Sequence, residues 1–159
     1  MNKGTMLQGK VAVVTGSGRG IGRDIALQMA AQGAKLVIND IGASVSGEGN
    51  DASPGQQVVD EIKASGVEAV LSTDSVADWT SANRIIQCAA DTFGRIDVVV
   101  NNAGILRDRL FFNMSVEEWK AVIDVHLNGC FYVSRAAAPH FKTQQSGAYV
   151  HMTSTSGLI

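Results

Sequence analysis

Glycine recurs at alternate positions in the stretch TGSGRGIG, which directly follows an apolar run. Glycine allows positive φ angles and lets a ligand approach the backbone closely. A helix that begins in such a turn presents free N–H groups and the positive end of its dipole, and both attract phosphates. A Walker loop is excluded because no Gly-Lys-Ser/Thr follows. The turn therefore predicts a pyrophosphate site formed by Gly16, Ser17, Gly18, Arg19, Gly20, Ile21 and Gly22.

Acidic residues follow the next two apolar runs. Asp40 ends the second run, where a carboxylate can accept hydrogen bonds from the ribose hydroxyls of an adenosine. The same charge would repel a 2′-phosphate, and no neighbouring Arg or Lys offsets it, so we expect NAD rather than NADP as the cofactor. Capping of a helix or turn is the alternative role for Asp40. Asp74 and Ser75 close the third run, where an adenine-edge contact and an Asx turn are both open.

The elements that must position these groups alternate along the chain. Continuous apolar, β-branched runs predict strands buried on both faces, and apolar residues at helical spacing predict the helices between them. Strands are expected at Val11–Thr15, Lys35–Asn39, Glu68–Ser72, from Val98 to Val100 and beyond, and at Gly147–Thr153. Helices are expected from Ile21 to Gly33, at Gln56–Ser65 and Trp79–Phe93, and from the capping box Ser115-x-x-Glu118 toward Lys142.

This order of elements predicts the fold class. Short loops between buried strands require parallel pairing with right-handed crossovers. We therefore expect an α/β fold with a doubly wound, Rossmann-like parallel sheet, represented by its first five strands. Residues 1–159 are expected to form one NAD-binding domain.

Composition narrows the class of protein. Apolar residues make up 45% of the chain and charged residues 18%, which suits a globular core, and a net charge of −2 without a basic run gives no footprint for nucleic acid. No apolar run is long enough to span a membrane, and the N-terminus lacks a signal region. Cys88 and Cys130 lack metal-ligand spacing and are expected to be reduced packing residues. We expect a cytoplasmic protein with no metal site and no nucleic-acid or membrane partner.

The glycine-rich turn, Asp40 and the segment Asn101-Asn-Ala-Gly104 after the fourth strand together resemble the short-chain dehydrogenase/reductase family. In that family the Asn-Ala-Gly segment supports the cofactor side of the sheet. The resemblance therefore implies this role for Asn102, Ala103 and Gly104, and we expect Val125 to lie beside the cofactor as well.

A narrower resemblance concerns Asn39-Asp-Ile-Gly42, the stretch from Arg95 to Arg109, and Asp124-Val-His-Leu127. These segments are similar to the (3R)-hydroxyacyl-CoA dehydrogenase domain of peroxisomal type 2 multifunctional enzymes and its bacterial relatives, some of which oxidise 17β-hydroxysteroids. The implied substrate is a bulky secondary alcohol, either a 3-hydroxyacyl-CoA or a 17β-hydroxysteroid. Arg107 and Arg109 could meet the phosphates of a coenzyme A, or could simply be solvated.

The same resemblance implies catalytic residues. The family's serine lies after the fifth strand in a Ser-x-x-Gly pattern, which Ser154 matches, although a shift of register would promote Thr153, Thr155 or Ser156 instead. Its hydroxyl would orient the substrate oxygen. His126 occupies the position of a family Asn that holds a water molecule in a proton relay. His126 could do the same, or could bond a backbone carbonyl at a helix kink.

The family's base is a Tyr-x-x-x-Lys pair beyond the serine, and the chain contains no such pair. Tyr132 and Tyr149 are followed four residues later by Ala136 and Thr153, so both are expected to be packing residues. We therefore expect these residues to belong to a longer dehydrogenase that forms a homo-oligomer, a dimer or tetramer, through the long helix beginning at Ser115. The 159 residues alone are expected to be inactive. The alternative is a non-catalytic NAD-binding or interaction protein.

Overall fold

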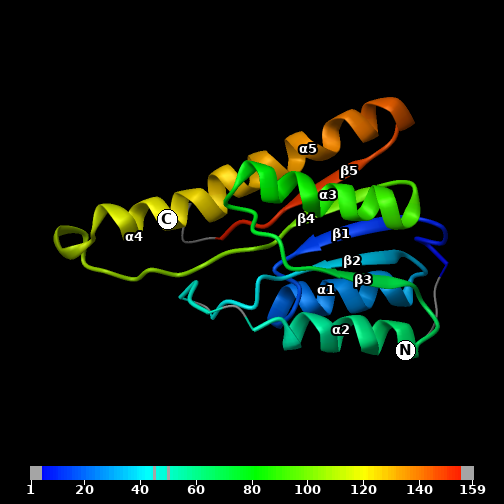
Figure 1. Cartoon of the computed structure of the whole chain (residues 1–159), viewed down its shortest axis with the longest axis horizontal. Helices are drawn as coiled ribbons and strands as arrows, with labels where there is room; N and C mark the ends of the chain where they lie inside the picture. The colour runs from blue at the N-terminus through cyan, green and yellow to red at the C-terminus, as the bar shows by residue number, and fades with distance from the viewer. Residues whose placement is uncertain (1–4, 45, 50, 155–159) are drawn as a thin grey trace.

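The strands form one parallel sheet. The computed structural model describes residues 5–44, 46–49 and 51–154, and within them the strand order is β3-β2-β1-β4-β5 (Figure 1). The strands are β1 (Val11–Thr15), β2 (Lys35–Asn39), β3 (Ala69–Ser72), β4 (Val98–Asn101) and β5 (Ala148–His151). The predicted doubly wound α/β fold is confirmed. Because all strands run in the same direction, the ends that carry Thr15, Asn39, Ser72 and Asn101 meet at one edge.

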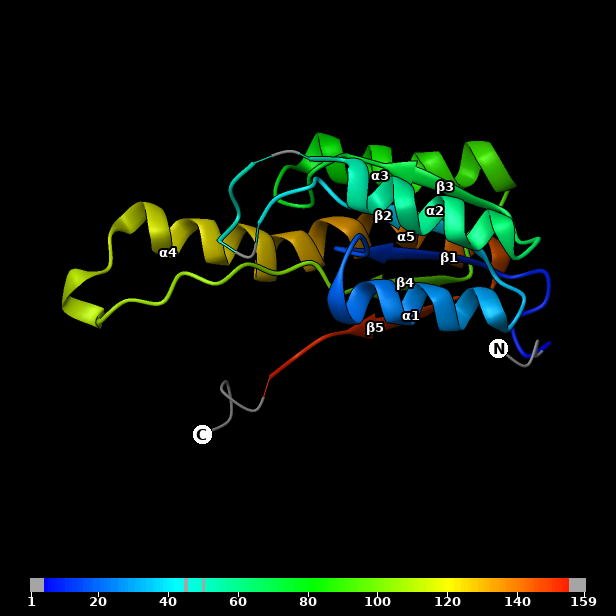
Figure 2. The same ribbon diagram turned by 90° about the horizontal axis from the view of Figure 1, so that it is seen from below.

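Helices cover both faces of the sheet. They are α1 (Gly20–Ala31), α2 (Ser53–Ala64), α3 (Trp79–Phe93), the short 3-10 helix η1 (Phe111–Asn113), α4 (Val116–Ile123), the π-helical segment η2 (Asp124–Asn128) and α5 (Gly129–Gln144). Helices α1 and α2 pack on one face, and α3 and α5 pack on the other (Figures 1 and 2).

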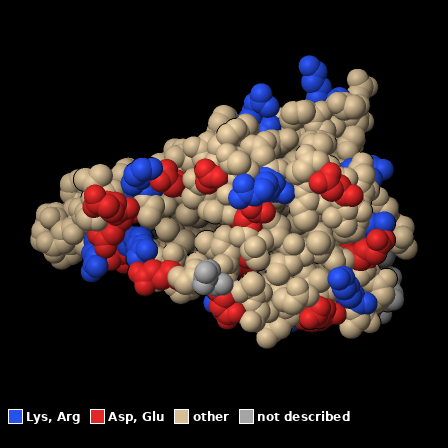
Figure 3. Space-filling model, viewed as in Figure 1, with Lys and Arg blue, Asp and Glu red and all other residues tan. Residues whose placement is uncertain are grey.

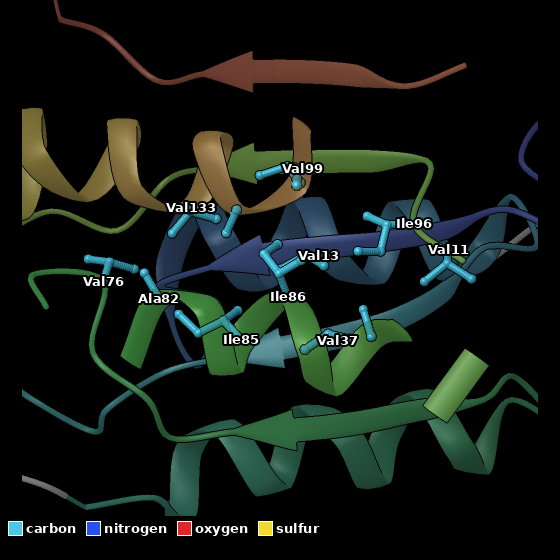
Figure 4. Close-up of a cluster of buried hydrophobic side chains, with 13 residues drawn as sticks. Val11, Val13, Val37, Val76, Ala82, Ile85, Ile86, Ile96, Val99 and Val133 are labelled. Atoms are coloured by element: carbon cyan, nitrogen blue, oxygen red, sulfur yellow. The ribbon is translucent and has the colours of Figure 1, made fainter. Parts of the chain in front are cut away.

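The central strand explains why the apolar runs are continuous. Along β1, Val11 and Val13 face the α3–α5 layer, and Ala12 and Val14 face the α1–α2 layer. All four side chains are at most 1% exposed, so no polar residue can alternate with them. Figure 4 shows the α3–α5 layer, in which Ile85 and Ile86 of α3 approach the strand valines.

Several elements differ from their predicted bounds, three of them by more than one or two residues. Helix α2 begins at Ser53 rather than Gln56. Its first turn accommodates Pro54, because an N–H at that position has no partner within a helix and proline carries none. The long helix after Ser115 is not uniformly α-helical, since η2 separates α4 from α5, although the predicted capping box is present. Strand β5 is shorter than predicted and its residues are exposed.

Charged side chains of both signs are interspersed on the face shown in Figure 3. Among the described residues, no helix has the length and apolar character needed to cross a membrane.

A buried carboxylate joins the beginnings of β1 and β4, at the edge of the sheet opposite Thr15. Asp97 is 4% exposed and accepts hydrogen bonds from the Arg95 guanidinium at 2.7 and 2.8 Å, from the Val11 N–H at 3.0 Å and from Lys10 Nζ at 3.2 Å. Burial by itself would raise the pKa of Asp97, but these donors outweigh it and hold the pKa below its ordinary value.

We expect Asp97→Asn to lower the free energy of unfolding by about 1–3 kcal/mol at neutral pH, since it weakens charge-assisted hydrogen bonds. The pKa of Asp97 is lower in the folded than in the unfolded state. The stabilisation is therefore complete above about pH 4 and is lost as the pH falls through the folded-state pKa. Urea unfolding across this range should show the gap between wild type and variant closing in acid. The exposed Asp60→Asn serves as the control, and a pH-independent gap would contradict the assignment.

Candidate functional site

A cavity of about 280 Å³ lies at the sheet edge where the strands end. Its wall comes from the turn after β1, the end of β2, the loop after β3, the segment after β4 and one residue of η2. Of the residues predicted to bind cofactor, those lining the cavity are Gly16, Arg19, Gly20, Asp40, Ser75, Asn102, Ala103, Gly104 and Val125. Residues from distant parts of the sequence thus meet around one space.

The other predicted residues of the glycine-rich turn lie outside the lining. Ser17 is buried, and its hydroxyl donates to the Val14 carbonyl at 2.7 Å, which fixes the turn to the end of β1. Gly18 donates its N–H to Asp40, and Ile21 is largely exposed. Gly22 packs tightly, because a Cβ there would lie 2.3 Å from the Gly16 carbonyl oxygen. These residues shape the turn, and direct contact with a cofactor stays a prediction for them.

The glycine-rich turn places the N-terminus of α1 at the cavity. Gly16 and Gly20 adopt positive φ angles of 63° and 53°, which side-chain-bearing residues rarely take. Helix α1 begins at Gly20, and its N-cap Arg19 makes no side-chain hydrogen bond to the first turn. Both Arg19 and Gly20 line the cavity. The arrangement therefore offers backbone N–H groups and a guanidinium to an anion.

Thr15 and Asn102 hold the turn against the segment after β4. Thr15 Oγ1 accepts hydrogen bonds from the N–H groups of Asn102 and Ala103, each at 3.0 Å. The Asn102 side chain in turn donates to the carbonyls of Thr15 and Gly16, again at 3.0 Å. The role of Thr15 was not singled out from the sequence; its only signal is its place immediately before the first glycine.

Asp40 has the capping role that the sequence left open as the alternative, and its contact with a ribose stays a prediction. Its carboxylate accepts the Gly18 N–H at 2.7 Å and the Gly42 N–H at 2.8 Å, so it caps two turns, and it also lines the cavity. Each carboxylate oxygen retains capacity for a further donor such as a ribose hydroxyl. Arg19 lines the same cavity. Arg19 comes from the preceding turn and is not a sequence neighbour of Asp40, so the absence of a neighbouring Arg or Lys along the chain does not exclude a cation at this cavity.

The two residues after β3 are placed differently. Ser75 lines the cavity, whereas Asp74 forms an ion pair with Arg84 at 2.6 Å and its backbone carbonyl accepts a hydrogen bond from Asn39 at 2.8 Å. The side chain of Asp74 is thus engaged with α3, and its contact with an adenine ring stays a prediction.

His126 lies in the π-helical segment and bonds the backbone of Ile105. Its Nε2 is 2.9 Å from the Ile105 carbonyl oxygen and 3.1 Å from the Ile105 nitrogen. The imidazole occupies the space beside Gly104, where a Cβ would lie 2.7 Å from His126 Cε1. These contacts match the alternative in which His126 bonds a backbone carbonyl at an irregular part of the helix. A part in proton transfer stays a prediction for His126.

Ser154 lies beyond the end of β5, is exposed, and does not line the cavity. Strand β5 is tied to its neighbours by Asn101, whose side-chain amide lies 3.0 Å from Ser134 Oγ and 3.2 Å from His151 Nδ1. Thr153 is described and exposed, whereas Thr155 and Ser156, the other register alternatives, lie outside the described residues. The catalytic assignment of Ser154 therefore stays a prediction.

The tyrosines pack as expected. Tyr132 meets Trp79 edge to face with ring centroids 5.8 Å apart. Tyr149 lies 4.9 Å from Phe141 between centroids and donates its hydroxyl to the Ser134 carbonyl at 2.9 Å. Partial burial raises the pKa of Tyr149, which disfavours a tyrosinate there.

Comparison with known proteins identifies the relatives of this chain. The family model for short chain dehydrogenases matches residues 10–159. A short-chain type dehydrogenase/reductase of Mycobacterium tuberculosis is 49% identical over 153 residues, which cover 96% of this chain and 54% of that protein. The peroxisomal multifunctional enzyme type 2 of Drosophila melanogaster is 47% identical over 150 residues, 94% of this chain and 25% of that enzyme.

A solved structure shares the fold. The crystal structure of a short chain dehydrogenase from Mycobacterium avium matches with a TM-score of 0.85 at 46% identity, covering 95% of this chain and 56% of that one. The chain thus spans between a quarter and just over half of the length of these three proteins.

We expect Asn102→Asp to destabilise the site, because a carboxylate would face the carbonyl oxygens of Thr15 and Gly16 without a proton to donate. The free energy of unfolding should fall by about 1–3 kcal/mol, the range for a polar group that loses its hydrogen-bond partner. Denaturant unfolding measures the loss, and Asn113→Asp, on the exposed helix η1, is the matched control. Equal stability of the two variants would show that Asn102 does not hold the turn.

Proposed function

This chain belongs to the short-chain dehydrogenase family, and from that premise we propose that the protein transfers hydride between NAD and a bulky secondary alcohol. The substrate class that the sequence supports is a 3-hydroxyacyl-CoA or a 17β-hydroxysteroid, oxidised to the ketone. The observation that carries the proposal is the cavity in which the glycine-rich turn, Asp40 and the Asn-Ala-Gly segment meet. The relative from Drosophila melanogaster, a peroxisomal multifunctional enzyme, supports the narrower assignment by similarity.

The residues around the cavity fit a nicotinamide dinucleotide. Gly16 and Gly20 leave the backbone open to a pyrophosphate. The first turn of α1 supplies N–H donors, and the side chain of the N-cap residue Arg19 does not bond to them. Asp40 can accept from the ribose hydroxyls while it continues to hold Gly18. NAD, when bound, accepts the hydride. Arg19 could offset the repulsion between Asp40 and a 2′-phosphate, so the preference for NAD is part of the proposal.

On the substrate side, we assign the orienting hydroxyl to Ser154 by its position after β5. It would donate a hydrogen bond to the alcohol oxygen and stabilise the charge that develops there. Neither described tyrosine is assigned the role of base, because Tyr132 packs on Trp79 and the Tyr149 hydroxyl is bonded to Ser134. The alternative is a protein that binds the dinucleotide without turnover. Oxidation of an alcohol by the full-length protein with NAD distinguishes the two functions.

We also propose that the protein is a homo-oligomer. Several large apolar side chains between the end of β4 and the first turn of α5 are exposed, although such residues are ordinarily buried. They are Leu106, Leu110, Phe111, Phe112, Val116, Trp119, Leu127 and Phe131. They lie on the part of the chain that extends away from the sheet in Figures 1 and 2. The molar mass of the full-length protein, measured by light scattering, tests this proposal; a cytoplasmic location stays a prediction.

We expect Ser154→Ala to reduce NAD-linked oxidation of 3-hydroxyacyl-CoA or 17β-hydroxysteroid by about a hundredfold in the full-length gene product. Affinity for NADH should be unchanged, because Ser154 lies outside the cofactor cavity. Steady-state kinetics and NADH fluorescence measure the two quantities, with Thr153→Ala as the neighbouring control. Unaltered turnover would remove Ser154 from the mechanism. A wild-type protein that binds NADH but oxidises neither substrate class would favour the non-catalytic alternative.

We expect Asp40→Ala to weaken NAD binding about tenfold and to shift the preference toward NADP, since a charged acceptor for the ribose is lost and the repulsion of a 2′-phosphate disappears. Asp40→Asn keeps the side-chain shape and one acceptor oxygen, so it separates the effect of charge from the loss of the Gly18 and Gly42 bonds. Fluorescence titration with NADH and NADPH provides the measurement. Unchanged preference in both variants would refute the ribose assignment.

A further inference from the structure

Backbone hydrogen bonds connect the described residues between β2 and α2. In the described residues 41–44 and 46–49, here called the β2–α2 loop, the Gly47 N–H donates to the Ser44 carbonyl at 2.8 Å and the Ser44 N–H donates to the Glu48 carbonyl at 2.7 Å. At its base, the Asp51 N–H donates to the Gly42 carbonyl at 3.0 Å. A side chain at Gly42 could not fit, because a Cβ would lie 2.0 Å from the Asp51 carbonyl oxygen.

This loop forms part of the cavity wall. Ala43 and Ser44 line the cavity, and the base of the loop is anchored where Asp40 accepts the Gly42 N–H at 2.8 Å. The carboxylate that we assign to the ribose therefore also holds the start of the loop. A change in the position of the loop would alter the cavity directly.

The far end of the loop reaches the segment after β4. A Cβ on Gly47 would lie 3.1 Å from Ile105 Cγ2, so the backbone there rests against the Ile105 side chain, which itself lines the cavity. Glu48 Oε1 lies 3.3 Å from Arg107 Nη1. The loop thus runs from the end of β2 to the segment that follows β4, and Figures 1 and 2 both show the two segments side by side.

Arg107 is held differently from the arginine two residues later. Its side chain is 24% exposed, and its buried Nε has no hydrogen-bond partner among the residues that the structure describes. Arg107 is therefore partly shielded from solvent, and a contact with a coenzyme A phosphate stays a prediction for it. Arg109 is 58% exposed and bonds Glu118 at 2.8 Å on its own segment. A cation that has lost much of its hydration depends on its counter-charge, and for Arg107 the ion pair is with Glu48, 59 residues away in sequence.

We propose that Glu48 and Arg107 fasten the β2–α2 loop beside the cofactor, so that their ion pair must break before the dinucleotide leaves the cavity. The proposal rests on the proposed function, because it takes the occupant to be a nicotinamide dinucleotide. Glu48 and Arg107 act through the loop and are positioning residues. Glu48 is 74% exposed, so the ion pair is only as strong as a solvent-accessible one. Loss of such a pair corresponds to an increase of about two- to fivefold in the rate of cofactor release.

The test is the rate of NADH and NADPH release from the full-length protein, measured by stopped-flow fluorescence with excess NAD as the displacing ligand and no alcohol present. Glu48→Gln and Arg107→Gln should each release the reduced cofactor about two- to fivefold faster than wild type. The double variant should be no faster than either single variant, because both remove the same interaction. Exchanging the charges, Glu48→Arg with Arg107→Glu, should restore slow release.

Two control variants break ion pairs of similar exposure elsewhere. Glu68→Gln removes a pair with Lys35 at the opposite edge of the sheet, and Arg109→Gln removes the pair with Glu118. Both should release cofactor at the wild-type rate. The acceleration caused by Glu48→Gln should vanish near 1 M salt, where exposed ion pairs are screened.

The outcomes separate this inference from the proposed function. A wild-type protein that binds neither NADH nor NADPH would overturn both. If wild type and Glu48→Gln both bind reduced cofactor and release it at the same rate at low salt, only the role of the ion pair would be overturned. Acceleration by Arg109→Gln equal to that of Arg107→Gln would also overturn it.

Discussion

The buried end of the central strand is the constraint on which the site depends. Thr15 is 1% exposed at the centre of the sheet, so its hydroxyl and carbonyl must find partners within the protein. Those partners are the N–H groups of Asn102 and Ala103 and the amide of Asn102. Satisfying one buried residue therefore fixes the glycine-rich turn relative to the segment after β4. The cavity between them follows from this attachment.

The features that local patterns determine could be predicted from the sequence. Strands such as β1 are continuous apolar runs because both faces are covered, and the turn after β1 needs glycine where φ is positive. The place of Asp40 beside the cavity could be predicted because it follows the end of a strand. Contacts between distant segments could not be found in this way. The ion pair of Glu48 with Arg107, and the identity of Ile105 as the partner of His126, depend on how loops fold back, which no periodicity encodes.

The π-helical segment is another feature that spacing did not reveal. A π turn adds a residue without changing the apolar pattern on either side, so α4 and α5 read as one helix from the sequence. Its consequence is local: His126 is brought onto the Ile105 backbone, and its ring fills the space that Gly104 leaves by lacking a Cβ. The same glycine was predicted for its closeness to a cofactor. The small size of Gly104 thus serves two purposes: it makes room for the His126 ring, and it leaves the cavity open. A prediction based on the cavity alone did not reveal the packing against His126.

The cavity and the proposed catalytic serine have different structural support. The turn after β1 stands at the centre of the sheet, between strands that are buried on both faces, so opening it would expose much of the core. Ser154 follows β5, where Tyr149 and Val150 are 38% and 45% exposed and the described chain provides pairing only from β4. Local opening costs least where few apolar contacts are lost. The position of the Ser154 hydroxyl therefore depends on contacts such as Asn101 with His151, whereas the cavity at the end of β1 depends on the core itself.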